Sequence, residues 1–158
     1  MIMNIGIIVF SVTGNTLSVA QKLQESLAAK GFTATLERIT GTKEKPDFKD
    51  NSLKDAPDPS PYDTILFGSP VWAATLPPVM KAYLSQLPSL NGKKAGCFVT
   101  HSFPQAWMGG NHTAHKMKSF CESKGASVFA EGVVNWSGKN REQQIAALIE
   151  TLTPSDKN

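Results

Sequence analysis

The sequence predicts a doubly wound α/β fold, in which a five-stranded parallel sheet in the order 2-1-3-4-5 carries helices on both faces. Apolar, β-branched runs alternate with amphipathic segments five times along the chain, although the second helix is degraded. Alternation of this kind is typical of parallel sheets. The chain has 158 residues, of which 41% are hydrophobic and 18% charged, so we expect a single domain over residues 1–158.

The first strand and helix have the clearest pattern. Residues 4–10, NIGIIVF, form a near-continuous apolar run, which indicates a strand buried on both faces. A helix follows residue 16, with an apolar stripe and Gly31 as its expected end. Residues 33–37 then alternate in polarity and predict the second strand.

Residues 40–61 interrupt the alternation. They contain four prolines among lysines, aspartates and serines. We interpret this segment as a surface connection with at most one short helix near residues 47–53.

Three strand–helix units complete the predicted sheet. The strands are expected at residues 63–67, 94–99 and 127–134, and the helices at residues 77–87, 111–124 and 141–152. Pro77 and Pro78 suit the first turn of a helix. With this strand order, the carboxyl ends of strands 1, 3 and 4 lie at the edge where such folds bind ligands.

The loop between the first strand and first helix has the residues of a phosphate site. Its hydroxyl groups and the backbone N–H groups of a helix N-terminus together supply many donors. Gly14 permits a tight turn, and the loop has neither the lysine of a Walker A motif nor a GxGxxG pattern. We expect it to hold a phosphate monoester; the alternative is a capped helix start that binds nothing. The loop comprises Ser11, Val12, Thr13, Gly14, Asn15 and Thr16.

Two further loops, residues 68–75 and residues 100–110, follow the third and fourth strands. Each contains one of the three tryptophans of the chain, Trp72 and Trp107. Aromatic side chains beside a cleft suit a flat ring that stacks, although they can equally cover the core. The candidate ligand contacts are Pro70, Val71, Trp72 and Ala73 in the second loop, and Thr100, His101, Ser102, Phe103, Trp107, Gly109 and Gly110 in the third.

The sequence resembles the flavodoxins over nearly the whole chain. Residues 11–16 match the family's phosphate loop, Ser/Thr-x-Thr-Gly-x-Thr, which holds the 5′-phosphate of FMN. Residues 68–72 resemble the family's second loop, whose tryptophan often covers one face of the flavin, and residues 100–110 stand where the third loop lies. The resemblance implies a short-chain, FMN-binding redox protein that transfers electrons through its bound FMN.

Several features depart from typical flavodoxins. The net charge is +3, whereas the family is acidic, and no acidic residue lies between Asp63 and Glu122. The third loop lacks the family's usual tyrosine and acids, and its Gly109-Gly110 pair resembles quinone reductases of the same fold. Three hypotheses therefore stay open: an electron carrier between partner proteins, an NAD(P)H-dependent quinone or flavin reductase, and a flavin-free phosphate-binding or interaction module.

Other functional classes lack support in the sequence. The longest basic run is two lysines, and no apolar run approaches the roughly 18 residues of a membrane span, so we expect neither nucleic-acid nor membrane binding. The chain start has no basic segment typical of a signal peptide. Cys97 and Cys121 form no CxxC motif, which favours core positions and a cytoplasmic protein. His112 and His115 have no further ligand nearby in sequence, so no metal is expected, and Trp136 is expected to pack on the last helix.

Overall fold

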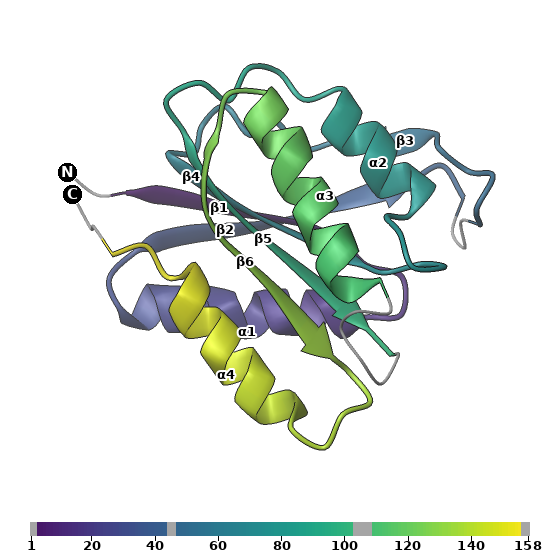
Figure 1. Cartoon of the computed structure of the whole chain (residues 1–158). Coiled ribbons are helices and arrows are strands. Elements are labelled where there is room, and N and C mark those ends of the chain that lie inside the picture. The colour runs from purple at the N-terminus through teal and green to yellow at the C-terminus, as the bar shows by residue number, and fades with distance from the viewer. Residues whose placement is uncertain (1–2, 44–46, 103–108, 156–158) are drawn as a thin grey trace.

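The computed structural model describes residues 3–43, 47–102 and 109–155 (Figure 1). Its strands are β1 (Asn4–Phe10), β2 (Thr33–Gly41), β3 (Leu53–Asp55), β4 (Thr64–Pro70), β5 (Lys94–His101) and β6 (Ser127–Asn135). Its helices are α1 (Asn15–Ala29), α2 (Pro78–Ser85), α3 (Gly110–Ser123) and α4 (Arg141–Leu152). The strands form one sheet in the order β3-β2-β1-β4-β5-β6.

The parallel part of the sheet confirms the predicted order. The five strands expected from the sequence are β2, β1, β4, β5 and β6, and each neighbouring pair among them is parallel. Three strands continue at least two residues further than predicted, since β2 continues to Gly41, β4 to Pro70 and β5 to His101. Pairing with neighbouring strands holds these polar extensions, which the apolar pattern alone does not mark.

The sixth strand, β3, was not predicted. It pairs antiparallel with the end of β2, where the register shifts between Thr40 and Gly41. Residues 47–50 form a turn and no helix, which is within the expected limit of at most one short helix near residues 47–53. An open sheet edge presents unpaired backbone groups, and pairing with β3 satisfies some of those on β2.

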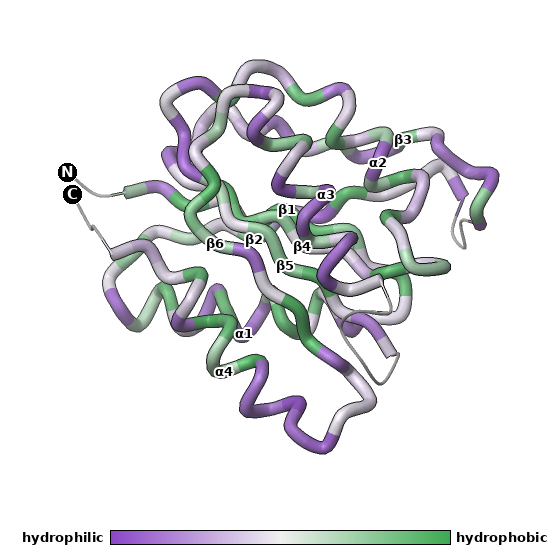
Figure 2. The backbone as a smooth tube through the Cα atoms, in the orientation of Figure 1, coloured by the Kyte–Doolittle hydropathy of each residue, from purple (hydrophilic) through white to green (hydrophobic). Residues whose placement is uncertain are grey.

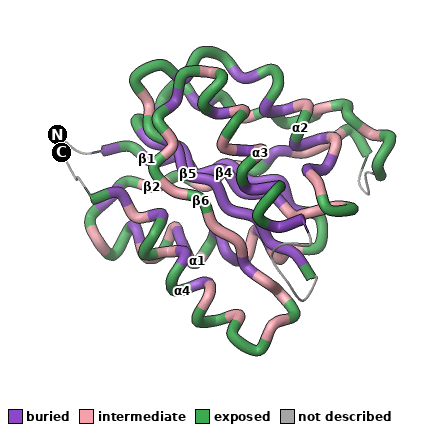
Figure 3. The backbone as a smooth tube through the Cα atoms, in the orientation of Figure 1, coloured by how far each residue is buried: buried purple, intermediate pink, exposed green. Residues whose placement is uncertain are grey.

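Helices cover both faces of the sheet and create two cores. Helices α1 and α4 lie on one face and α2 and α3 on the other (Figure 1). Alternate residues of β1 enter different cores: Ile7 packs with the α1 and α4 residues and Ile8 with those of α2 and α3. The central strands are mainly hydrophobic (Figure 2) and buried (Figure 3), as a sheet covered on both faces requires.

Cys97 and Cys121 lie in the core between β5 and α3. Both side chains are buried and form no disulfide. A hydrogen bond with Cys121, together with burial, raises the pKa of the Cys97 thiol. Within residues 3–43, 47–102 and 109–155, no group of three or more side chains is placed to hold a metal ion. No helix in these same ranges combines the length and apolar character that a membrane crossing needs.

Candidate cofactor site

The phosphate loop, residues 11–16, joins β1 to α1 through a tight turn. Gly14 precedes the helix with a φ of 97°, a conformation that favours glycine. A Cβ atom built there would meet no atom within 4 Å, so the loop faces open space. Among the described residues, the backbone N–H groups of residues 12–16 have no recorded acceptor. A helix N-terminus with free, converging donors is the arrangement that binds an anion.

Three contacts hold this loop in place. The Ser11 hydroxyl accepts a hydrogen bond from the Leu17 N–H at 3.3 Å, and Arg38 Nη2 donates to the Ser11 carbonyl at 2.9 Å. The hydroxyls of Thr16 and Thr100, both buried, lie 2.9 Å apart. The last contact joins the phosphate loop to the end of β5, where the third loop begins. Two predicted site residues far apart in sequence are thus brought together.

The second loop turns sharply after Trp72. The backbones of Trp72 and Thr75 exchange two hydrogen bonds of 2.9 Å, so Ala73 and Ala74 form a tight turn between them. Both alanines have positive φ, 47° and 63°. Each L-residue in this region costs about 1–2 kcal/mol, and such strain is concentrated in functional loops.

Two aromatic rings flank Trp72: Phe10 at the end of β1 and Phe48 in the connection between β2 and β3. The Trp72 ring lies edge-on to Phe10 at 5.8 Å and to Phe48 at 5.5 Å between centroids. Phe48 is 56% exposed, which is unusual for so large an apolar side chain. Sequence reasoning missed Phe48; the signal was a lone aromatic residue in a segment otherwise rich in charge and proline.

A carboxylate also lies beside this loop. Asp47 lines a cavity of about 450 Å³ together with Phe48, Val71, Trp72 and Ala73. No acidic residue lies between Asp63 and Glu122 in the sequence, but an acidic residue from outside that stretch still lies beside the second loop. Residues outside that stretch fold back against the second loop.

The second and third loops touch at Gly109. This residue precedes α3 with a φ of 113°, and a Cβ atom built on it would lie 2.5 Å from Ala74 Cα. At Gly110, a Cβ atom would lie 2.8 Å from Val133 Cγ1. Close packing therefore explains both glycines of the pair. Phe103 and Trp107, the predicted ring contacts of this loop, lie outside the described residues.

The turn after β6 supports the start of the third loop. The Trp136 N–H donates to the His101 carbonyl, and the Ser137 hydroxyl donates to the Ser102 carbonyl, each at 2.7 Å. His101 is buried and Ser102 is exposed, so the two contacts hold the chain as it leaves the sheet. The same turn also packs on the last helix as predicted, since the Arg141 guanidinium lies 4.5 Å from the Trp136 ring centroid.

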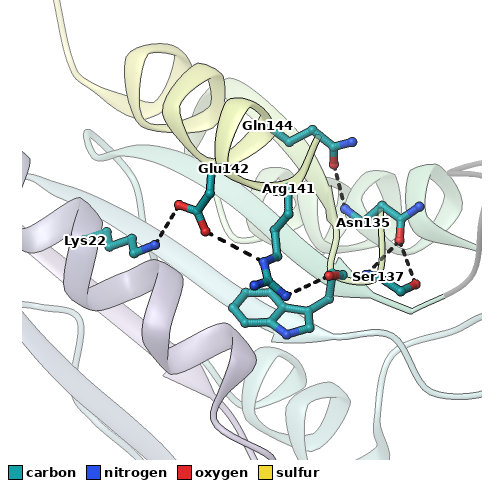
Figure 4. A network of polar contacts seen from close by, with 7 residues as sticks. Lys22, Asn135, Ser137, Arg141, Glu142 and Gln144 are labelled. Carbon is teal, nitrogen blue, oxygen red and sulfur yellow. Dashed lines mark hydrogen bonds and ion pairs between the residues drawn. The ribbon is translucent and has the colours of Figure 1, made fainter. Parts of the chain in front are cut away.

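A chain of polar contacts connects that turn to α1 (Figure 4). Arg141 Nη1 donates to the Trp136 carbonyl at 3.0 Å, and Arg141 Nε lies 3.7 Å from Glu142. Glu142 in turn pairs with Lys22 of α1 at 3.0 Å. The exposed ion pairs contribute little energy, but they bring the helix of the phosphate loop and the support of the third loop into one network.

The fold defines a class: doubly wound α/β proteins with a glycine-containing turn and a helix N-terminus directly after the first strand. Residues 7–148 match the model of the flavodoxin family, and the chain belongs to that family. It is therefore an FMN-binding flavoprotein that transfers electrons. No curated protein matches the sequence significantly.

Solved structures share the fold at low identity. The flavodoxin of Megasphaera elsdenii, in its two-electron reduced form, is 24% identical, with 93% of this chain and 96% of that chain covered and a TM-score of 0.64. The flavodoxin of Streptococcus pneumonia TIGR4 is 18% identical, with 94% and 97% covered and a TM-score of 0.66. A flavoprotein of Lactobacillus acidophilus in complex with FMN is 17% identical, with 90% and 98% covered and a TM-score of 0.63.

Proposed function

We propose that the three loops at the carboxyl edge of the sheet hold FMN, and that the protein carries electrons between partner proteins. The observation that carries this proposal is the set of backbone N–H groups of residues 12–16, which surround the Gly14 turn and have no backbone acceptor among the described residues. The FMN phosphate is an anion of the size and charge that such a turn binds.

The phosphate loop binds through neutral donors. Thr13 is exposed and its hydroxyl is available to a phosphate oxygen. Thr16 is buried against Thr100, so one of these hydroxyls can donate to the other while the second still donates to the ligand. Hydrogen bonds to a charged group contribute about 1.5–3 kcal/mol each, which makes the loop an effective anchor without a lysine.

The second and third loops position the flavin ring. Trp72 offers an aromatic face beside the phosphate loop, and its contacts with Phe10 and Phe48 limit its movement. Val71 is held by the hydrogen bond from its N–H to the Thr100 carbonyl at 3.0 Å. Bound FMN supplies the reversible acceptance of electrons, and these residues supply binding and orientation.

A second candidate function is an NAD(P)H-dependent quinone or flavin reductase. One observation favours it: a groove lined by Arg38, Lys43 and Lys54 lies directly beside the phosphate loop. Positive charge attracts an anionic nucleotide.

Anaerobic addition of NADH or NADPH to the FMN-loaded protein separates the two functions. A carrier keeps its flavin absorbance until a reductase protein is added as well. Rapid bleaching by the nucleotide alone would overturn the carrier and favour the reductase. A protein that takes up no FMN would overturn both, and would leave the flavin-free phosphate-binding module.

The proposal also includes the cellular location of the protein and the kind of partner it contacts. Free thiols at Cys97 and Cys121 suit a reducing cytoplasm, which supports a cytoplasmic protein. The exposed Phe48 beside Trp72 suits contact with a redox partner protein, since exposed aromatic residues are enriched in interfaces.

A further inference from the structure

The unpredicted strand β3 builds a groove beside the phosphate loop. The groove has a volume of about 400 Å³ and lies between the ends of β1 and β2 and the strand β3. Its wall includes Ser11 and Val12 of the phosphate loop on one side and Lys54 and Asp55 of β3 on the other. Small-molecule sites have volumes of roughly 300–1,000 Å³, so the groove has room for a group larger than a single ion.

Cations predominate in this groove. Arg38, Lys43 and Lys54 line it, and among the described lining residues Asp55 is the only carboxylate. Within the described residues, Arg38 and Lys54 take part in no ion pair, while Lys43 is paired with Asp50 at 2.7 Å. Even with Asp50 included, the cations outnumber the carboxylates.

Arg38 is prepared to bind an anion. Its Nη2 atom donates to the Ser11 carbonyl at 2.9 Å, which fixes the guanidinium at the wall of the groove. A guanidinium has five N–H donors, so most of them are left for a ligand, and their planar fork matches phosphate oxygens. The hydroxyls of Ser11, Thr40 and Thr42 lie in the same wall.

The carboxylate of the groove is held in place by hydrogen bonds with Thr40. The Thr40 hydroxyl donates to Asp55 Oδ2 at 2.7 Å, and the Asp55 N–H donates to the same hydroxyl at 3.1 Å. These bonds hold Asp55 against β2. Arg38 and Lys54 have no comparable side-chain partner that would occupy their charge within the described residues.

We infer that this groove is a second anion site, which binds a phosphate- or pyrophosphate-bearing small molecule while FMN occupies the phosphate loop. The inference rests on the proposed function only in assigning residues 12–16 to FMN. Because Ser11 and Val12 line the groove and Arg38 contacts the Ser11 carbonyl, an anion in the groove lies directly beside the proposed phosphate site. A substrate anchored there through its phosphates would be held at the same sheet edge as the flavin.

Inorganic pyrophosphate is the first probe, added to FMN-loaded protein and followed by amide NMR. We expect saturable shifts at residues 38–43 and 53–55, and at least tenfold weaker binding in Lys54→Glu and in Arg38→Gln. Lys94→Glu is the matched control, since this exposed lysine begins β5 at the opposite edge of the sheet and the same charge is reversed. Shifts confined to residues 12–16, or equal losses in Lys54→Glu and Lys94→Glu, would overturn the inference.

NADH and NADPH distinguish the sources of the anion. Dinucleotide binding at the same residues, at least tenfold tighter than that of pyrophosphate, supports a nucleotide site, whereas equal affinity supports a site for free phosphate compounds. Flavin absorbance of each sample is recorded separately. Normal FMN uptake without any groove binding overturns this inference alone, while absence of FMN uptake overturns the proposed function.

Discussion

At the scale of single residues, Gly109 combines a left-handed backbone conformation with a close contact to the second loop of the proposed cofactor site. Its φ of 113° disfavours any side chain, and a Cβ atom there would lie 2.5 Å from Ala74 Cα. Gly109→Ala should therefore lower the free energy of unfolding by about 2–4 kcal/mol, from the left-handed conformation and the overpacking together. It should also weaken FMN binding, because the clash displaces the turn that follows Trp72.

Gly92→Ala provides the control for this substitution. Gly92 has a φ of 80°, but a Cβ atom there would meet nothing within 4 Å. The expected loss is about 1–2 kcal/mol with FMN affinity unchanged. Urea unfolding and flavin titration of both variants measure the two effects. Equal FMN affinity in Gly109→Ala and the wild type would show that the contact between the two loops is irrelevant to the site.

Thr13 and Thr16 allow a direct test of the phosphate loop. Replacing either by alanine removes a hydrogen bond to a charged group, worth about 1.5–3 kcal/mol, so FMN affinity should fall roughly ten- to hundredfold. Thr151→Ala, on α4, removes a hydroxyl that donates to the Ala147 carbonyl and should leave affinity unaltered. If titrations gave the same dissociation constant for all three variants, the phosphate would have to bind elsewhere.

The residues of the phosphate loop could be predicted because its hydroxyls, backbone donors and glycine are adjacent in the sequence. The donors of residues 11–16 and the position of Gly14 follow from residue type and spacing alone. Phe48 and Asp47 could not be predicted as site residues, because their approach to Trp72 depends on how a proline-rich connection folds back. The contact between Gly109 and Ala74 likewise joins two loops separated by an entire strand and helix.

At the scale of elements, the turn between β6 and α4 is expected to position the third loop. The Ser137 hydroxyl donates to the Ser102 carbonyl at 2.7 Å. Ser137→Ala removes this bond, which contributes about 0.5–1.5 kcal/mol, and should weaken FMN binding by up to about tenfold. Circular dichroism of the bound flavin should change as well, because the start of the third loop, which we propose contacts the flavin, loses a support.

Ser119→Ala is the matched control for that turn. Its hydroxyl also donates to a carbonyl, that of His115, but on the exposed surface of α3. Flavin affinity and flavin dichroism should match those of the wild type. Comparable losses of FMN affinity in the Ser137 and Ser119 variants would mean that Ser137 affects only the stability of the fold.

Strand β3 marks the limit of element prediction from this sequence. The central strands β1, β4 and β5 carry apolar runs because both of their faces are buried, so they were predictable. The outer parallel strands β2 and β6 are more exposed, and their place follows from the alternation of strands and helices. Strand β3 is short, half-exposed and polar, and it forms because the edge of β2 offers backbone partners. A pattern based on burial cannot detect a strand that buries so little.

At the scale of the whole molecule, acid should destabilise the fold. Hydrogen bonds and ion pairs lower the pKa values of Asp50, through Lys43, of Asp58, through Ser60, and of Glu142, through Lys22. The unfolded state then binds more protons, so this stability is complete above the ordinary values of 3.8 and 4.5 and is lost as pH falls through the lower folded values.

Urea unfolding between pH 7 and pH 3 measures this effect. The free energy of unfolding should be level down to about pH 5 and fall below it. Lys43→Ala removes the cation that is paired with Asp50, so the free energy of unfolding should decrease less between pH 5 and pH 3 in this variant. Equal stability at pH 3 and pH 7 would contradict the assignment.

The balance of charge over the whole surface also affects the flavin potentials. The acid-free stretch of sequence predicts a reduced, anionic flavin that is less disfavoured than in acidic flavodoxins. Asp47, which lines the same cavity as Trp72, opposes this effect, because its negative charge disfavours a second negative charge nearby. Asp47→Asn should therefore raise the midpoint potential of the second electron, which a dithionite titration measures.

The central claim is that the phosphate loop anchors FMN through its phosphate. Parallel titration of the apoprotein with FMN and with riboflavin, followed by quenching of flavin and tryptophan fluorescence, tests it most directly. The two ligands share the ring and differ in the phosphate, which several charge-assisted hydrogen bonds should hold at about 1.5–3 kcal/mol each. FMN should bind at least about a hundredfold more tightly than riboflavin. Equal affinities would contradict the account.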